Sequence, residues 1–133
     1  MKPIVTSIEE LYGRREPTGD RILDEVVNCL CKTQIIAAAD LAILMDVKKP
    51  HLYGAMHILT GLSLGDFINR WRLLQARELL QQGAESEAKQ GFGQSATGTN
   101  RVKRLDKVAR RCGWRSYRVL LRVAKRYDFE LEQ

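Results

Sequence analysis

Apolar side chains recur every three or four residues along most of the chain. This period predicts helices rather than strands. Polar or glycine-containing segments separate the periodic runs, which cover residues 20–33, 37–46, 49–59, 63–82, 105–112 and 116–127. The predicted fold class is therefore all-α. The longest run starts with capping-box spacing at Ser63 and Asp66, and its roughly nineteen residues would form a rod about 28 Å long.

The same pattern predicts which residues are buried and where helices end. Asp20 is the expected N-cap of the first long helix, whose buried stripe should hold Ile22, Leu23, Val26, Val27, Leu30 and Cys31. Gly61 is expected to end a helix in the left-handed conformation. The larger core residues should include Met56, Trp71 and Trp114.

These runs suggest four parts. Residues 1–19 would be an N-terminal arm, and 20–82 a first helical subdomain with a long connecting helix. Residues 83–104 lack periodicity and are rich in Gly, Ser, Thr, Gln and Ala, so they are expected to form a flexible linker. Residues 105–133 would be the second subdomain. There, a short helix, a turn at Gly113 and a helix capped by Ser116 are typical of a helix-turn-helix.

Positive charge is concentrated in the second part of the chain. Residues 1–82 carry ten basic and ten acidic side chains, whereas residues 83–133 carry twelve basic and six acidic ones and so account for the net charge of +6. Between Arg101 and Arg126 there are eleven basic residues and one acid, Asp106. Such an excess favours a polyanionic partner, although a solvated charged face would give the same composition.

Other classes of protein find little support. No run of 18 apolar residues predicts a membrane span, and the first residues lack the apolar core of a signal peptide. The three cysteines have no metal-binding spacing, which indicates reduced thiols in a cytoplasmic protein. His51 and His57 lack a further ligand at metal-site spacing. No phosphate loop or catalytic motif is present, so neither an enzyme nor a cofactor is expected.

Two segments about 67 residues apart repeat one pattern, with LAILMDV matching VARRCGW. Two such units joined by a rigid helix resemble the DNA-binding domain of AraC-type transcription regulators. The stretch TGLSLGDFINRWRLLQARELL resembles the end of that family's first unit and its connecting helix. VARRCGWRS and RVAKRY resemble signatures of the second unit. The resemblance covers about residues 20–128.

The resemblance implies a cytoplasmic, nucleoid-associated regulator that binds double-stranded DNA as a monomer. Its two recognition helices would enter major grooves about 34 Å apart. The implied base-contacting residues are Tyr117, Arg118, Leu121 and Arg122 in the second unit, and Lys49, Pro50, Tyr53 and Gly54 in the first. Contacts with phosphates are expected from Lys103, Arg104, Lys107, Arg110, Arg115, Ser116 and Lys125.

The sequence departs from the family at several of these positions. The family usually has an arginine or another polar residue where Gly54 stands, and His57 and Ala124 replace a lysine and a phenylalanine. The chain resembles the family's stand-alone members, so no sensory domain is expected. We therefore expect the second unit to supply most of the affinity and base recognition. The alternative is a protein-interaction module, for example one that binds RNA polymerase or a recombination complex, with mainly non-specific DNA binding.

Overall fold

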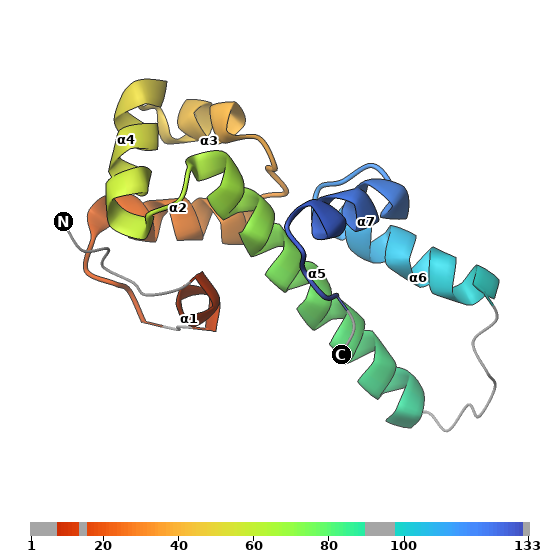
Figure 1. Cartoon of the computed structure of the whole chain (residues 1–133). Coiled ribbons are helices and arrows are strands. Elements are labelled where there is room, and N and C mark those ends of the chain that lie inside the picture. The colour runs from red at the N-terminus through yellow and green to blue at the C-terminus, as the bar shows by residue number, and fades with distance from the viewer. Residues whose placement is uncertain (1–7, 14–15, 90–97, 132–133) are drawn as a thin grey trace. The chain divides into compact units, whose positions relative to one another are not determined.

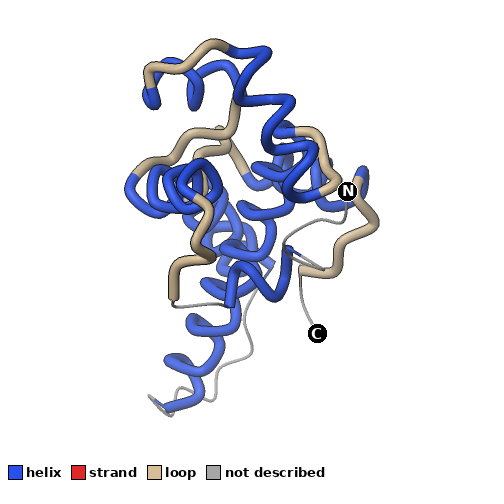
Figure 2. The backbone as a smooth tube through the Cα atoms, turned by 90° about the vertical axis from the view of Figure 1, so that its left-hand side faces the viewer, coloured by secondary structure: helices blue, strands red, loops and turns tan. Residues whose placement is uncertain are grey.

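The computed structural model describes residues 8–13, 16–89 and 98–131, and everything regular in these ranges is helical (Figures 1 and 2). This confirms the all-α fold class. The helices are α1 (Ile8–Gly13), α2 (Arg21–Lys32), α3 (Ala38–Met45), α4 (Lys49–Thr60), α5 (Leu64–Lys89), α6 (Gly98–Arg111) and α7 (Tyr117–Arg126). The chain forms two compact units, Met1–Trp71 (unit 1) and Arg72–Gln133 (unit 2). Their boundary falls inside α5 and not after Gln82.

Unit 1 is built on α2, which packs against both α3 and α4. Leu23, Val26 and Leu30 of α2 are fully buried. Asp20 caps the helix as expected, because its Oδ1 accepts a 2.9 Å hydrogen bond from the N–H of Leu23. Cys31, in contrast, is exposed. That prediction was wrong because Cys31 lies about 100° further around the helix than Leu30, beyond the buried side.

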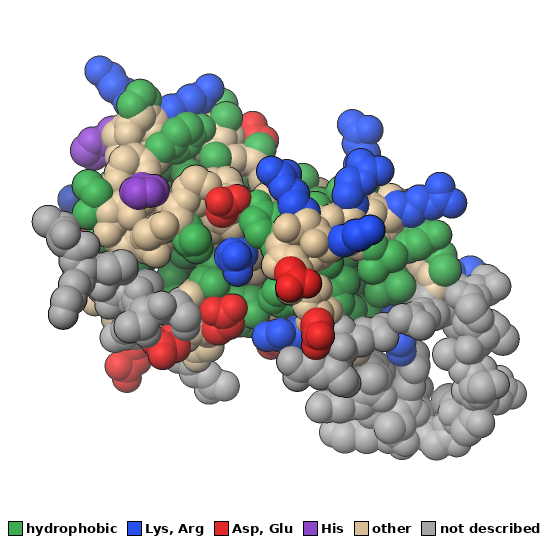
Figure 3. Space-filling model, in the orientation of Figure 1, with side chains coloured by type: hydrophobic (Ala, Val, Ile, Leu, Met, Phe, Trp, Pro, Cys, Tyr) green, Lys and Arg blue, Asp and Glu red, His purple; other side chains and the backbone are tan. Residues whose placement is uncertain are grey.

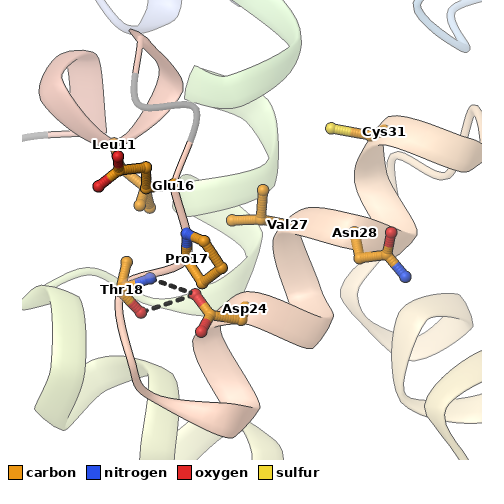
Figure 4. A pocket seen from close by; sticks show the side chains of 8 residues that line it. All are labelled: Leu11, Glu16, Pro17, Thr18, Asp24, Val27, Asn28 and Cys31. Carbon is orange, nitrogen blue, oxygen red and sulfur yellow. Dashed lines mark hydrogen bonds between the residues drawn. The ribbon is translucent and has the colours of Figure 1, made fainter.

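The N-terminal segment packs into unit 1. Ile8 and Leu11 of α1 are buried, and the Tyr12 ring meets Trp71 of α5 edge-on at 4.9 Å between centroids. The loop before α2 is fastened by Asp24, whose Oδ1 accepts hydrogen bonds from the N–H and hydroxyl of Thr18 at 2.8 and 2.7 Å (Figure 4). The described part of the predicted arm is therefore a packed element.

The turns after α3 and α6 share one backbone arrangement. Asp46 and Gly113 both adopt left-handed conformations, with φ of 56° and 101°. The N–H of Val47 donates to the carbonyl of Ala42, and the N–H of Trp114 donates to that of Ala109, at 3.1 and 2.9 Å. These are αL turns that satisfy the last carbonyls of a helix. The two turns, whose left-handed residues Asp46 and Gly113 are 67 positions apart, therefore have the same local conformation.

The long helix α5 begins as predicted but ends later. The N–H of Asp66 donates to Ser63 Oγ at 3.2 Å, which satisfies one of the free donors of the first turn. The predicted run ends at residue 82, just before Gly83, yet α5 continues to Lys89, and α6 already begins at Gly98. The predicted linker of residues 83–104 is therefore largely helical at both ends. A glycine inside a helix costs only about 1 kcal/mol, and the Ala, Glu and Lys around it favour helix. Residues 90–97 lie outside the described ranges.

Unit 2 packs α6 against α7. The apolar residues at helical spacing along α6 and the turn after it are buried, together with the predicted core residue Trp114: Leu105, Val108, Ala109, Cys112 and Trp114. The C-terminal segment also packs, because Arg77 of α5 lies over the Phe129 ring at 4.8 Å and Leu131 is buried.

Candidate nucleic-acid interface

Helix α7 is sharply divided into a buried side and a basic side. Leu120 and Ala124 are buried against α6, whereas Arg118, Arg122 and Lys125 are exposed. Because these three cations lie at i, i+4 and i+7, they share one outward stripe. Leu121, 43% exposed, and the half-buried Tyr117 are the uncharged members of the predicted base-contacting set.

The predicted phosphate-contacting residues also lie on unit 2. Lys103, Lys107, Arg110, Arg115 and Lys125 are exposed, while Arg104 and Ser116 are half-buried. Basic side chains accordingly gather over α6 and α7 in the space-filling view (Figure 3). Unit 2 carries fourteen basic and seven acidic residues, a net charge of +7, whereas unit 1 carries eight and nine. The net positive charge of the chain therefore lies on unit 2.

Arg118 is the cation nearest the start of α7. Its guanidinium carbon lies 6.0 Å from the centre of the Tyr117 ring. A hydrogen bond with the Tyr117 side chain raises the pKa of Arg118, so the guanidinium stays charged throughout the physiological range.

A carboxylate from α6 caps the start of α7. Ser116 occupies the N-cap position, but its side chain makes no capping hydrogen bond, so the prediction for that hydroxyl was wrong. The N–H of Tyr117 instead donates to Asp106 Oδ1 at 3.1 Å, while Asp106 Oδ2 pairs with Arg110 Nε at 3.1 Å. An acid eleven residues away in sequence replaces the local cap because the turn folds α6 back beside α7. The sequence signal was that Asp106 is the single acid in a basic stretch.

The corresponding helix of unit 1 presents a different surface. Lys49, Pro50 and Gly54 of α4 are exposed, and Tyr53 is half-buried. A Cβ added at Gly54 would meet nothing within 4 Å, so this part of the helix surface is open. Lys48 is the N-cap and makes no side-chain capping hydrogen bond. Helix α4 thus begins with two lysines and no carboxylate, in contrast to α7.

Arg72 is a buried cation that the sequence pattern did not reveal. It has no exposed surface, and its guanidinium donates to Gln75 Oε1 at 2.9 Å. The signal was present in the helical spacing, because Arg72 lies four residues from both Ile68 and Ala76 on the buried side of α5. Nearby, burial raises the pKa of the Cys112 thiol to about 11, although the positive charges of Arg72 and Arg111 act in the opposite direction. The Arg72 and Cys112 side chains are therefore part of the interior of unit 2.

The described residues also bear on metal binding, cavities and membrane spans. Nowhere in these ranges do three or more His, Cys, Asp or Glu side chains gather as metal ligands would. A cavity of about 310 Å³ in unit 1 is lined by eight residues of α1, α2 and the loop between them (Figure 4). Its Asp24 carboxylate is already used by the Thr18 hydrogen bonds. No helix in the described part is both long and apolar enough to cross a bilayer.

Comparison of the chain with family models, curated proteins and solved structures gives no match. The resemblance to AraC-type regulators therefore rests on the residues alone.

Proposed function

We propose that this chain is a transcription regulator of AraC type that binds double-stranded DNA through α7. The observation that carries the proposal is the outward stripe of Arg118, Arg122 and Lys125 on a helix whose other side is buried. A helix fits the major groove of B-DNA, where base edges differ in their donors and acceptors. The proposed location is the cytoplasm, on the nucleoid.

Recognition would be divided between two groups of side chains. Arg118 and Arg122 can each donate two hydrogen bonds to guanine O6 and N7, and Leu121 can contact the methyl group of thymine. Each good arginine–guanine pair contributes about 1–3 kcal/mol of discrimination. Lys103, Lys107 and Arg115 would neutralise phosphates, which orients the protein on the duplex without selecting a sequence.

The role proposed for Asp106 follows from its position between these groups. By capping α7 it fixes the direction in which the basic stripe points, and by pairing with Arg110 it holds one cation close to the α6 backbone. A recognition helix must be held rigidly, because its contacts with bases depend on hydrogen-bond geometry. Asp106 would thus be a positioning residue, while Arg122 is a contacting one.

Unit 1 would add little base recognition. Gly54 has no side chain at a position where the resemblance implies a contact with a base, and Pro50 has no N–H to donate. The uncapped start of α4, with Lys48 and Lys49, suits a phosphate better than a base.

A second candidate function is a protein-interaction module that binds DNA without selecting a sequence. The observation in its favour is that unit 1 has a net charge of −1 and exposes Ile43 and Leu44 on α3. In that case RNA polymerase or a recombination complex would be the main partner.

Selection of bound duplexes from a random pool separates the two functions. A regulator should enrich one motif, and the logarithm of its affinity should fall with the logarithm of salt concentration with a slope of several units. Two enriched half-sites a helical turn apart would assign base reading to both units, and a single half-site would assign it to unit 2. Equal affinity for all duplexes would rule out the sequence-specific regulator.

A further inference from the structure

The chain reverses direction directly after α7. The N–H of Asp128 donates to the carbonyl of Lys125 at 3.1 Å, and the N–H of Phe129 donates to that of Ala124 at 2.8 Å. Asp128 itself is left-handed, with φ of 51°. Together these features form a Schellman motif, which satisfies the last carbonyls of the helix and fixes the direction in which the chain leaves it.

Residues 128–131 then form a C-terminal strap that returns to α5 (Figure 1). Phe129 is half-buried and Leu131 is buried, while Glu130 between them is exposed. The Phe129 ring lies under the guanidinium of Arg77 on α5, with 4.8 Å between the ring centre and the guanidinium carbon. The face of an aromatic ring attracts a cation, so this contact joins the strap to α5.

The last turn of α7 has little side-chain packing of its own. Its buried residue is Ala124, whose side chain is one methyl group, and Val123 is half-buried. A single methyl group makes few contacts, so it restrains the helix weakly. The strap therefore holds the end of α7, as Asp106 holds its start.

We propose that Arg77 and Phe129 are positioning residues for recognition by α7, because they fix the angle at which its basic stripe meets the duplex. This proposal rests on the proposed binding of double-stranded DNA. Both side chains would act through Arg118 and Arg122, whose direction they secure, and not by touching bases themselves.

A small rotation of α7 is enough to disturb contacts with bases. Lys125 lies eight residues after Tyr117, about 12 Å along the helix, so a rotation of about 10° about the start of α7 would move it by about 2 Å. Arg122, five residues along, would move by about 1.3 Å. Contacts with base edges require placement within about 0.5 Å, whereas a flexible lysine can follow a phosphate. Loosening the strap should therefore reduce sequence discrimination far more than overall affinity.

Fluorescence anisotropy titrations of the full chain with the selected duplex and with a random duplex test this role. The ratio of the two affinities should fall at least about tenfold in Phe129→Ala, while affinity for the random duplex stays within about twofold. Arg77→Met, which removes the cation but keeps a long side chain, should also lower the ratio. Phe129→Tyr and Arg77→Lys should retain the wild-type ratio, because they keep the ring and the cation.

Glu130→Gln is the matched control, since it changes an exposed side chain of the same strap. Its lost charge acts on both duplexes alike, so the ratio should not change. Circular dichroism of each variant checks that the fold is retained, and Arg77→Met remains the test if Phe129→Ala unfolds.

The outcomes separate this role from the proposed function. A wild type that binds all duplexes alike would overturn the regulator, and the positioning role with it. A wild type that discriminates, together with an unchanged ratio in folded Phe129→Ala or in Arg77→Met, would overturn the positioning role alone. A parallel loss of affinity for both duplexes would also overturn it, because the strap would then serve only the stability of unit 2.

Discussion

The backbone N–H of Tyr117 donates to the carboxylate of Asp106, 3.1 Å away, across the turn between α6 and α7. Removing that carboxylate leaves the first N–H of α7 without its acceptor and also breaks the Arg110 pair. We expect Asp106→Ala to lower the free energy of unfolding by about 1–2 kcal/mol. Urea denaturation followed by circular dichroism measures the change.

Ser116→Ala is the control for this variant. The Ser116 side chain makes no capping bond, so its removal should cost less than about 0.5 kcal/mol. A larger loss for Ser116→Ala than for Asp106→Ala would show that the serine is the true cap in solution.

The exposed cations of unit 2 should separate into two functional groups. Arg122→Ala should cost about 1–3 kcal/mol on the selected duplex and little on a random one, because it removes a base contact. Lys103→Ala should weaken binding to both duplexes alike and reduce the salt slope by about one unit. Fluorescence anisotropy titrations at several salt concentrations measure both effects. Indistinguishable behaviour of the two variants would refute the division into contacting and positioning cations.

Gly54 can accept a side chain at no steric cost. A Cβ there meets nothing within 4 Å, so Gly54→Ala should stabilise unit 1 by about 0.5–1 kcal/mol through better helix propensity. Gly61, with φ of 77°, is the contrasting case, and Gly61→Ala should destabilise by about 1 kcal/mol or more. Thermal denaturation of the two variants should therefore give shifts of opposite sign.

The same open position tests whether unit 1 can read DNA. Gly54→Arg places a guanidinium where the family resemblance implies a reader. If α4 lies in a major groove, the variant should prefer duplexes with a guanine at one additional position, which a repeated selection would reveal. An unchanged selected motif would indicate that α4 does not face bases.

Stability should fall at high pH because of Cys112. Burial raises the pKa of this thiol from 9.0 to about 11 in the folded chain. Below pH 9 both states keep the proton, so the thiol contributes its full stability there. Between pH 9 and about 11 the unfolded chain loses the proton more readily, and the contribution declines, by at most about 2–3 kcal/mol.

The free energy of unfolding should be measured for the wild type and for Cys112→Ala between pH 8 and about 11, and the second value subtracted from the first. The contributions of the other titrating groups cancel in this difference. A pH-independent difference would contradict the raised pKa. Thiol alkylation at pH 8 offers a second check, because the exposed Cys31 should react well before the buried Cys112.

The sequence by itself determined most of the helices and the buried side of each. Apolar residues at helical spacing place Leu105, Val108, Ala109 and Cys112 in the core regardless of what they pack against, because a helix must bury its apolar side. Residues with strong local preferences were equally clear, such as Asp20 at an N-cap and Gly61 in a left-handed cap.

Only the tertiary structure decided the features that depend on distant partners. The cap of α7 comes from Asp106 in place of Ser116 because the turn brings α6 alongside, and hydrogen bonds across a turn leave no periodic trace in sequence. The composition of residues 83–104 likewise did not reveal that both ends of the predicted linker are helical. Adding a residue to an existing helix needs no new nucleation, so α5 and α6 can extend into segments whose own helix propensity is weak. The exposure of Ile43 and Leu44 also depended on packing. The apolar pattern predicts that a helix has a buried side, but the neighbouring helices determine how much of that side is covered.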